Sequence, residues 1–149
     1  MKTMEKKIKA VQDRVKRLEQ LSATLSSFGK YQASPDAKDI AERNLQVAIE
    51  GCLDIAKLVI SSMELPEPKD NKGVFTTLAE AGILGNESLK FLVPMAGTRN
   101  VLVHGYDKVE DSIIYNVIKQ HLKDFAVFLK EIKENYLNAA KKADHSNGP

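Results

Sequence analysis

The sequence is poor in the residues that form disulfides and metal sites. It has a single cysteine, Cys52, and three histidines, His104, His121 and His145, that lie far apart along the chain. One cysteine has no partner for an intramolecular disulfide, and Cys52 lies among apolar residues at helical spacing, so we expect a small core residue. A reactive thiol is the alternative interpretation. The Cys and His spacing that zinc sites use does not occur, so we expect no metal site.

Long apolar runs and glycine-rich loops are also missing. No stretch approaches the roughly 18 consecutive apolar residues that cross a membrane, and the first residues, MKTMEKKIKAVQ, lack the apolar run of a signal peptide. The eight glycines do not form a phosphate-binding loop of either common type. We therefore expect a cytoplasmic protein that makes no membrane contact and binds no cofactor.

Neither sign of charge dominates the chain. The formal net charge is only +2, so affinity for nucleic acid would depend on how the basic residues are distributed. Residues 1–20 carry seven Lys or Arg against three acids, whereas residues 61–90 carry three basic groups against five acidic ones. The amino-terminal segment is therefore mildly basic, which a solvated helix surface explains as well as an RNA contact does.

Apolar residues recur at three- and four-residue steps along most of the chain, which is typical of amphipathic helices. Sustained alternation of polar and apolar residues, the mark of strands, does not occur. The pattern predicts an all-α antiparallel bundle of four long helices and one short helix. The long helices are expected over residues 3–28, 35–63, 86–105 and 110–137, and the short one over 74–85. One domain would cover residues 1–137, followed by a disordered tail over 138–149.

Local signals mark several helix boundaries. Ser34 is expected to cap a helix that begins at Pro35, and Asn86 to cap another. The stretch ELPEPKDNKG reads as a loop. Pro94 has no amide donor, so we expect the helix around it to be kinked or broken between Phe91 and Thr98.

The octet RNVLVHGY, residues 99–106, gathers polar groups that can act on a phosphate. Asn100 and His104 share a helix face, whereas Arg99 and His104 diverge by about 140° around the helix and about 7.5 Å along it. They can meet if the arginine side chain swings round, or if a second subunit supplies one group across a twofold axis. The alternative is that both groups only cap helix carbonyls or form a surface ion pair.

The spacing of Arg99, His104 and Tyr106 resembles the signature of HEPN-domain toxins of the HepT type. These are the ribonuclease halves of toxin and antitoxin pairs in which the partner is a minimal nucleotidyltransferase. The similarity extends further, because ERNLQVAIEGCLDIAKLVI resembles the second helix of that family and FTTLAEAGIL its short third helix. Thr98 departs from the pattern, since an aromatic residue is expected before the arginine.

The resemblance implies a metal-independent endoribonuclease that is active as a homodimer, with a cleft lined by both copies of the motif. His104 would move protons, Arg99 would stabilise charge on the phosphate, and Asn100 would orient the imidazole or the phosphate. The nucleotidyltransferase antitoxin would silence the toxin by attaching AMP to Tyr106. The added phosphate would then occupy the anion site beside Arg99 and repel RNA.

Two other functions fit the same residues. A non-catalytic HEPN-type helical dimer would bind nucleotide or a partner protein, because Arg99 and His104 can each hold a phosphate without breaking it. Alternatively, the octet is purely structural in a helical oligomer. His121 is interpreted separately, as a histidine at the margin of the core.

Overall fold

The structure is a computed structural model that describes residues 2–104 and 109–140. These residues form helices and no strands: α1 (Lys2–Thr24), α2 (Phe28–Gln32), α3 (Pro35–Ser62), α4 (Asn71–Glu80), α5 (Asn86–His104), α6 (Asp111–Asn116) and α7 (Leu122–Ile132), with two π-helical turns, η1 (Val117–His121) and η2 (Lys133–Leu137). The predicted all-α class is confirmed. Residues 138–140 are still helical, and the rest of the predicted tail lies outside the described residues.

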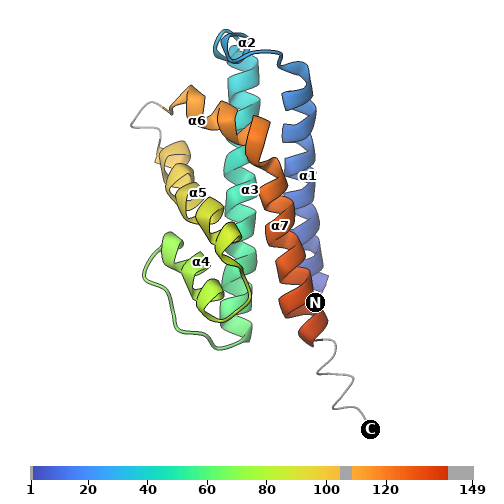
Figure 1. Cartoon of the computed structure of the whole chain (residues 1–149), viewed down its shortest axis with the longest axis vertical. Coiled ribbons are helices and arrows are strands. Elements are labelled where there is room, and N and C mark those ends of the chain that lie inside the picture. The colour runs from blue at the N-terminus through green and yellow to red at the C-terminus, as the bar shows by residue number, and fades with distance from the viewer. Residues whose placement is uncertain (1, 105–108, 141–149) are drawn as a thin grey trace.

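Four long helices run alternately up and down along the bundle (Figure 1). They are α1, α3, α5 and the continuous helix that α6, η1, α7 and η2 form together. The short α4 lies beside α3 and α5, as Figure 1 shows. The predicted arrangement of four long helices and one short helix is therefore confirmed, and α2 is an addition to it. None of the helices in the described residues is long and apolar enough to cross a membrane.

The first helix ends earlier than its sequence pattern predicts. α1 stops at Thr24, and Lys119 from η1 donates to the carbonyls of Ser22 and Leu25 at 2.7 and 2.6 Å. Lys119 thus supplies a charged donor to carbonyls at the end of α1, where Ser22 also accepts from the amide of Leu25 at 3.1 Å. Residues 28–32 form a separate helix, α2, where the sequence pattern predicts the end of the first helix and a loop. Phe28 of α2 packs edge-on against Tyr115 of α6 and so ties this short helix to the bundle.

Of the two predicted helix caps, Ser34 is confirmed and Asn86 is wrong. Ser34 accepts from the amide of Ala37 at 3.1 Å and Pro35 begins α3, as expected. Asn86 is instead the first residue inside α5, because the carbonyl of Gly85 accepts the first helical bond, from Leu89. The short helix α4 begins three residues before its predicted start, where Asp70 caps it by accepting from the amide of Gly73 at 2.8 Å.

The predicted break at Pro94 does not occur, because α5 runs without interruption from Asn86 to His104. The alternative, a kink at this position, stays a prediction. Pro94 is exposed, so the hydrogen bond that it cannot make is lost on the solvent side. Its neighbours Phe91, Leu92 and Met95 are buried against the bundle and hold the helix in place across the proline. The octet therefore begins in the last turns of one continuous helix rather than in a separate segment.

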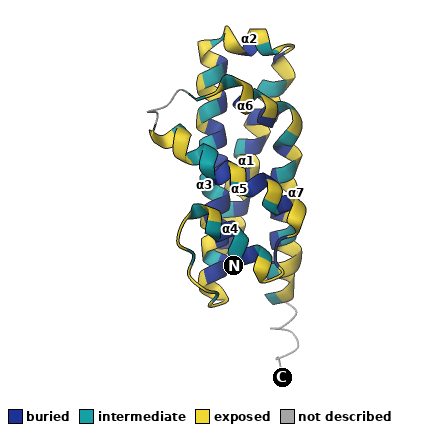
Figure 2. Cartoon of the chain, turned by 60° about the vertical axis from the view of Figure 1, so that its left-hand side comes forward, coloured by how far each residue is buried: buried dark blue, intermediate teal, exposed yellow. Residues whose placement is uncertain are grey.

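The core is built from the inward faces of all the long helices, which Figure 2 shows as dark blue bands. Cys52 is fully buried there, and burial raises the pKa of its thiol, which confirms the prediction of a core residue. α1 and α3 approach closely at Gly51, where an added Cβ would lie 2.5 Å from a methyl carbon of Val11. Glycine at this position allows the close packing of the two helices.

The amino-terminal end of α5 is fixed by α7. One oxygen of Glu131 accepts from the amide of Gly85 at 2.6 Å, and the other accepts from the hydroxyl of Ser88. Asn135 adds a hydrogen bond of 2.8 Å to the carbonyl of Ile83. A carboxylate at the start of a helix also interacts favourably with the helix dipole. These contacts help to determine where α5, which includes residues 99–104, lies on the bundle.

Replacing Glu131 by alanine is expected to lower the free energy of unfolding by about 2 kcal/mol, because two donors at the start of α5 lose a charged acceptor. Urea unfolding followed by circular dichroism measures this change. Glu134→Ala is the matched control: Glu134 is exposed on η2, and its pairing with Lys130 at 3.9 Å should contribute less than about 0.5 kcal/mol. Equal effects of the two substitutions would contradict a special role for Glu131.

Acidic residues meet where α3 packs near α6. Burial raises the pKa of Glu42, and the nearby charges of Asp111 and Asp39 raise it further, against the opposite effect of Lys38. Lys38 also pairs with Asp111 at 3.7 Å. A raised pKa in the folded state means that the fold favours the protonated form, so ionised Glu42 lowers stability as the pH rises.

Glu42→Gln should therefore raise the thermal midpoint at pH 8, since the amide cannot ionise. The difference from the wild-type chain should shrink as the pH falls and vanish below the ordinary carboxyl pKa of 4.5, where Glu42 is protonated in both the folded and the unfolded state. Thermal unfolding at a series of pH values measures this. Glu67→Gln in the exposed loop before α4 serves as the control, and a pH dependence of the same size there would refute the assignment to Glu42.

Candidate functional site

The candidate site lies at the carboxyl-terminal end of α5, which projects from the bundle. Asn100, Val101, Val103 and His104 are all exposed there, and Figure 2 shows this end of the helix in yellow. The exposed fractions of Val101 and Val103 are 39% and 41%, which is high for apolar side chains on a helix that is otherwise packed. Exposure on several sides means that this end of α5 has few neighbours within the described part of the chain.

Arg99 is the most enclosed polar residue of the octet that the structure describes. Its side chain is 26% exposed, and its Nη2 lies 3.5 Å from Oε2 of Glu50 on α3. Nη1 donates to the side-chain oxygen of Asn100 at 3.3 Å. Glu50 is itself held by Gln46, which donates to its other oxygen at 2.9 Å. Arg99 therefore points toward α3. It belongs to a connected set of polar side chains that also contains Gln46, Glu50 and Asn100.

The guanidinium of Arg99 is only partly satisfied by these contacts. Its Nε is buried and has no hydrogen-bond partner in the structure. A buried donor without an acceptor costs about 1–3 kcal/mol. A contact of 3.5 Å to one carboxylate oxygen is also longer than a well-formed charged hydrogen bond, for which about 2.8 Å is usual. The arrangement thus leaves donor capacity on Arg99 for an anion.

His104 is the last residue of α5 and is exposed. Because α5 remains helical to this point, the expected angular divergence between Arg99 and His104 applies to the folded chain. Arg99 faces α3, whereas His104 is exposed to solvent. Their convergence on one phosphate stays a prediction. Tyr106 lies outside the described residues.

The side chain of Asn100 contacts that of Arg99. The helical spacing predicted only that Asn100 shares a face with His104. Thr98, which replaces the expected aromatic residue, donates from its hydroxyl to the carbonyl of Pro94 at 3.1 Å. This bond keeps the Thr98 side chain on its own helix.

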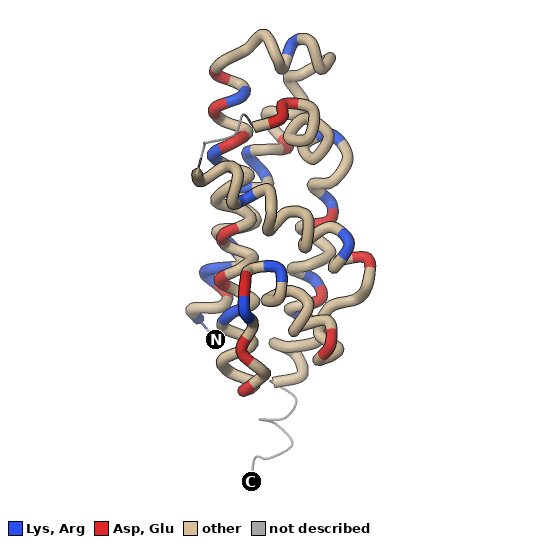
Figure 3. Tube along the Cα trace, turned by 90° about the vertical axis from the view of Figure 1, so that its left-hand side faces the viewer, with Lys and Arg blue, Asp and Glu red and all other residues tan. Residues whose placement is uncertain are grey.

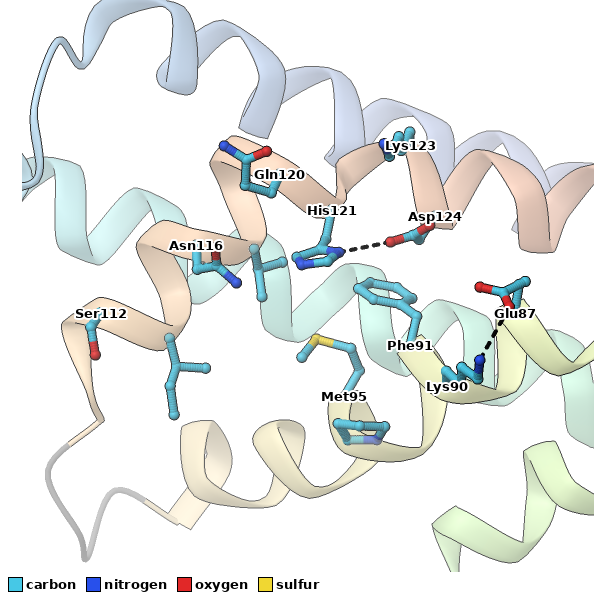
Figure 4. Close-up of a pocket in the computed structure, with 13 residues that line it drawn as sticks. Glu87, Lys90, Phe91, Met95, Ser112, Asn116, Gln120, His121, Lys123 and Asp124 are labelled. Carbon is cyan, nitrogen blue, oxygen red and sulfur yellow. Dashed lines mark hydrogen bonds and ion pairs between the residues drawn. The ribbon is translucent and has the colours of Figure 1, made fainter.

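A groove of about 820 Å³ separates α5 from α6 and α7 (Figure 4). His121 lies in it, with its Nδ1 2.9 Å from Asp124 and its ring stacked on Phe91 at a centroid distance of 6.0 Å. The residue is neither fully buried nor fully exposed, which confirms the interpretation of a histidine at the core margin. Lys90 and Glu87 form an ion pair at one end of the groove, and Ser112 lies at the opposite end.

Charges of both signs are scattered over the face that carries α4 and α5 (Figure 3). α5 itself is sparsely charged, since Glu87, Lys90 and Arg99 are its only acidic, lysine or arginine residues. The one among them that belongs to the octet is Arg99. Arg99 is therefore the only lysine or arginine in the last turns of α5.

Glu50 is the site residue that sequence reasoning missed. It lies 49 positions before Arg99, within a helix whose apolar face dominates the pattern. The only signal was the pair of polar residues Gln46 and Glu50, which are four positions apart and so share a helix face. That spacing is common on solvated helices and does not reveal a partner on another helix.

Comparison with known proteins agrees with this architecture. The family described as Ribonuclease HepT-like matches residues 11–132. The mRNA nuclease HepT of Shewanella oneidensis is 31% identical over 127 residues, which cover 85% of this chain and 93% of that protein. The tRNA nuclease HepT of Aphanizomenon flos-aquae is 26% identical over 132 residues, covering 89% and 86%.

A solved structure of the tri-AMPylated HEPN toxin from Shewanella oneidensis, in complex with its MNT antitoxin, has the same fold. Its TM-score is 0.80 at 29% identity, and the match covers 87% of this chain and 96% of that one. The similarity extends over nearly the whole relative, so it includes the helices on both sides of the octet. By sequence and by fold, the chain belongs to the HepT-like ribonuclease family.

Proposed function

We propose that this protein is a ribonuclease toxin of a toxin and antitoxin pair, and that Arg99 and His104 cleave RNA without a metal ion. The observation that carries the proposal is the position of these two residues: they lie at the exposed end of α5 in a chain of the HepT-like family. The relatives named as mRNA and tRNA nucleases support RNA as the substrate.

The proposed reaction uses the 2′-hydroxyl of the RNA as the nucleophile. His104 takes the proton from that hydroxyl as its oxygen attacks the adjacent phosphorus, or returns a proton to the 5′-oxygen that leaves. An imidazole can do either near neutral pH, since the unperturbed pKa of histidine is about 6.5. Negative charge gathers on the phosphate oxygens in the transition state, and the guanidinium of Arg99 supplies charged donors for them. Asn100 positions Arg99 through the hydrogen bond that joins the two side chains.

A homodimer is part of the proposal, because the two groups face different directions within one chain. Arg99 is turned to α3 and His104 is exposed at the helix end. The same turns expose Val101 and Val103, which a second subunit would cover. A twofold axis near this end of α5 would bring His104 of one protomer toward Arg99 of the other.

The cognate partner is proposed to be a minimal nucleotidyltransferase in the same cytoplasm. The support is the AMPylated relative that was solved with its MNT antitoxin. AMP transfer to Tyr106 would add a phosphate within seven residues of Arg99 along the chain and would compete with RNA for the guanidinium. The rival function, a dimer that binds nucleotide or protein without chemistry, uses the same residues, so only an activity measurement separates the two.

Expression of the wild-type chain should arrest growth, and the purified protein should cleave total RNA in the presence of EDTA. Arg99→Ala and His104→Ala should each lower the cleavage rate by about 100-fold or more, because each removes a group that acts in the transition state. His121→Gln is the matched control, since His121 lies in the groove between α5 and α7 and should retain activity. RNA binding without cleavage by the wild-type protein would favour the non-catalytic dimer, and full activity of His104→Ala would remove its catalytic role.

A further inference from the structure

We infer that Glu50 sets the affinity of the proposed site for RNA, by holding Arg99 in a carboxylate contact that an RNA phosphate must replace. The inference rests on the proposed function, because it assumes that Arg99 meets the RNA. Glu50, on α3, would affect RNA binding through its contact with Arg99 on α5. It also gives a role to an acidic side chain on another helix that contacts Arg99.

The carboxylate of Glu50 is held in position from both sides. Gln46, one turn earlier on α3, donates to its Oε1 at 2.9 Å, and its Oε2 faces Nη2 of Arg99 at 3.5 Å. The side chains of Glu50 and Arg99 are 35% and 26% exposed. Each is thus partly open to solvent, so an anion can exchange with the carboxylate without unfolding of α3 or α5.

The contact between Glu50 and Arg99 uses only part of the hydrogen-bonding capacity of the guanidinium. Of the donor nitrogens of Arg99, Nη1 and Nη2 have acceptors, whereas Nε has none. A phosphate can accept two parallel bonds from one edge of a guanidinium, which a single carboxylate oxygen at 3.5 Å does not do. A rotation of the side chain that presents Nε and Nη2 to a phosphate would satisfy both donors.

Glu50 opposes this exchange through its charge. While Gln46 holds it, the carboxylate remains close to the place where the phosphate binds and repels it. The resting protein therefore keeps Arg99 neutralised, and only an RNA with sufficient contacts elsewhere displaces Glu50. Removal of the charge should therefore tighten RNA binding. If Glu50 only supported the position of Arg99, removal of its charge would instead weaken RNA binding.

Asp54 provides a matched control on the same helix. It lies one turn after Glu50, and both residues line a groove between α1 and α3 that also contains Lys7 and Arg43. Its recorded ion pair is with Lys7, at 3.9 Å, and not with Arg99. Asp54→Asn removes the same charge from the same face, so it measures the general electrostatic effect on RNA binding.

The test uses a mixed-sequence RNA oligonucleotide whose 2′-hydroxyls are all methylated, so that the 2′-oxygen cannot attack. Fluorescence anisotropy at low salt measures its dissociation constant. Glu50→Gln should bind the oligonucleotide about two- to fivefold more tightly than the wild-type chain, the range expected for loss of one partly exposed charge interaction. Glu50→Asp, which withdraws the carboxylate by one methylene, should show a smaller gain, and it replaces Glu50→Gln if that variant does not fold.

The gain must depend on Arg99. It should vanish when Glu50→Gln is combined with Arg99→Ala, and it should exceed the gain of Asp54→Asn. An equal gain without Arg99 or in Asp54→Asn, unchanged or weaker binding in Glu50→Gln, or no binding by any variant would overturn the inference. Cleavage of unmodified RNA tests the proposed function separately: cleavage that requires Arg99, together with no gain in Glu50→Gln, would remove the role of Glu50 alone.

Discussion

The candidate site depends on how α5 is anchored at one end and exposed at the other. Glu131 holds the amino-terminal end by accepting from the amide of Gly85 and the hydroxyl of Ser88, and buried side chains such as Leu92 and Met95 hold the middle. The last turns have exposed valines and a terminal histidine instead. The anchored helix therefore holds residues 99–104 at a defined place on the bundle, with exposed surface available for a partner or a substrate.

The helical class and the number of long helices followed from the sequence because apolar residues mark one face of each helix. Leu18, Leu45 and Phe125 are examples: each lies in a three- and four-residue pattern, and each is buried. The motif was equally visible, since Arg99, Asn100 and His104 stand close together in an otherwise apolar stretch. Local patterns of this kind survive folding because their spacing is fixed by the helix itself.

Features that depend on contacts between distant segments were not predictable in the same way. The early end of α1 is stabilised by Lys119, and the formation of α2 by Tyr115, both far along the chain. Pro94 does not break α5, because packing of the buried face outweighs one missing hydrogen bond. The link between Arg99 and Glu50 joins α5 to α3. In each case a tertiary contact overrides or adds to a local signal.

The exposed end of α5 is proposed as a site that two subunits share, and mixing inactive protomers tests this most directly. Arg99→Ala and His104→Ala proteins, unfolded together and refolded as a mixture, form hybrid dimers in which one protomer retains the arginine and the other the histidine. If the groups meet across the twofold axis, one of the two sites in each hybrid is intact, and the mixture regains RNA cleavage that neither parent shows. A mixture that contains hybrid dimers and stays inactive would contradict the shared site.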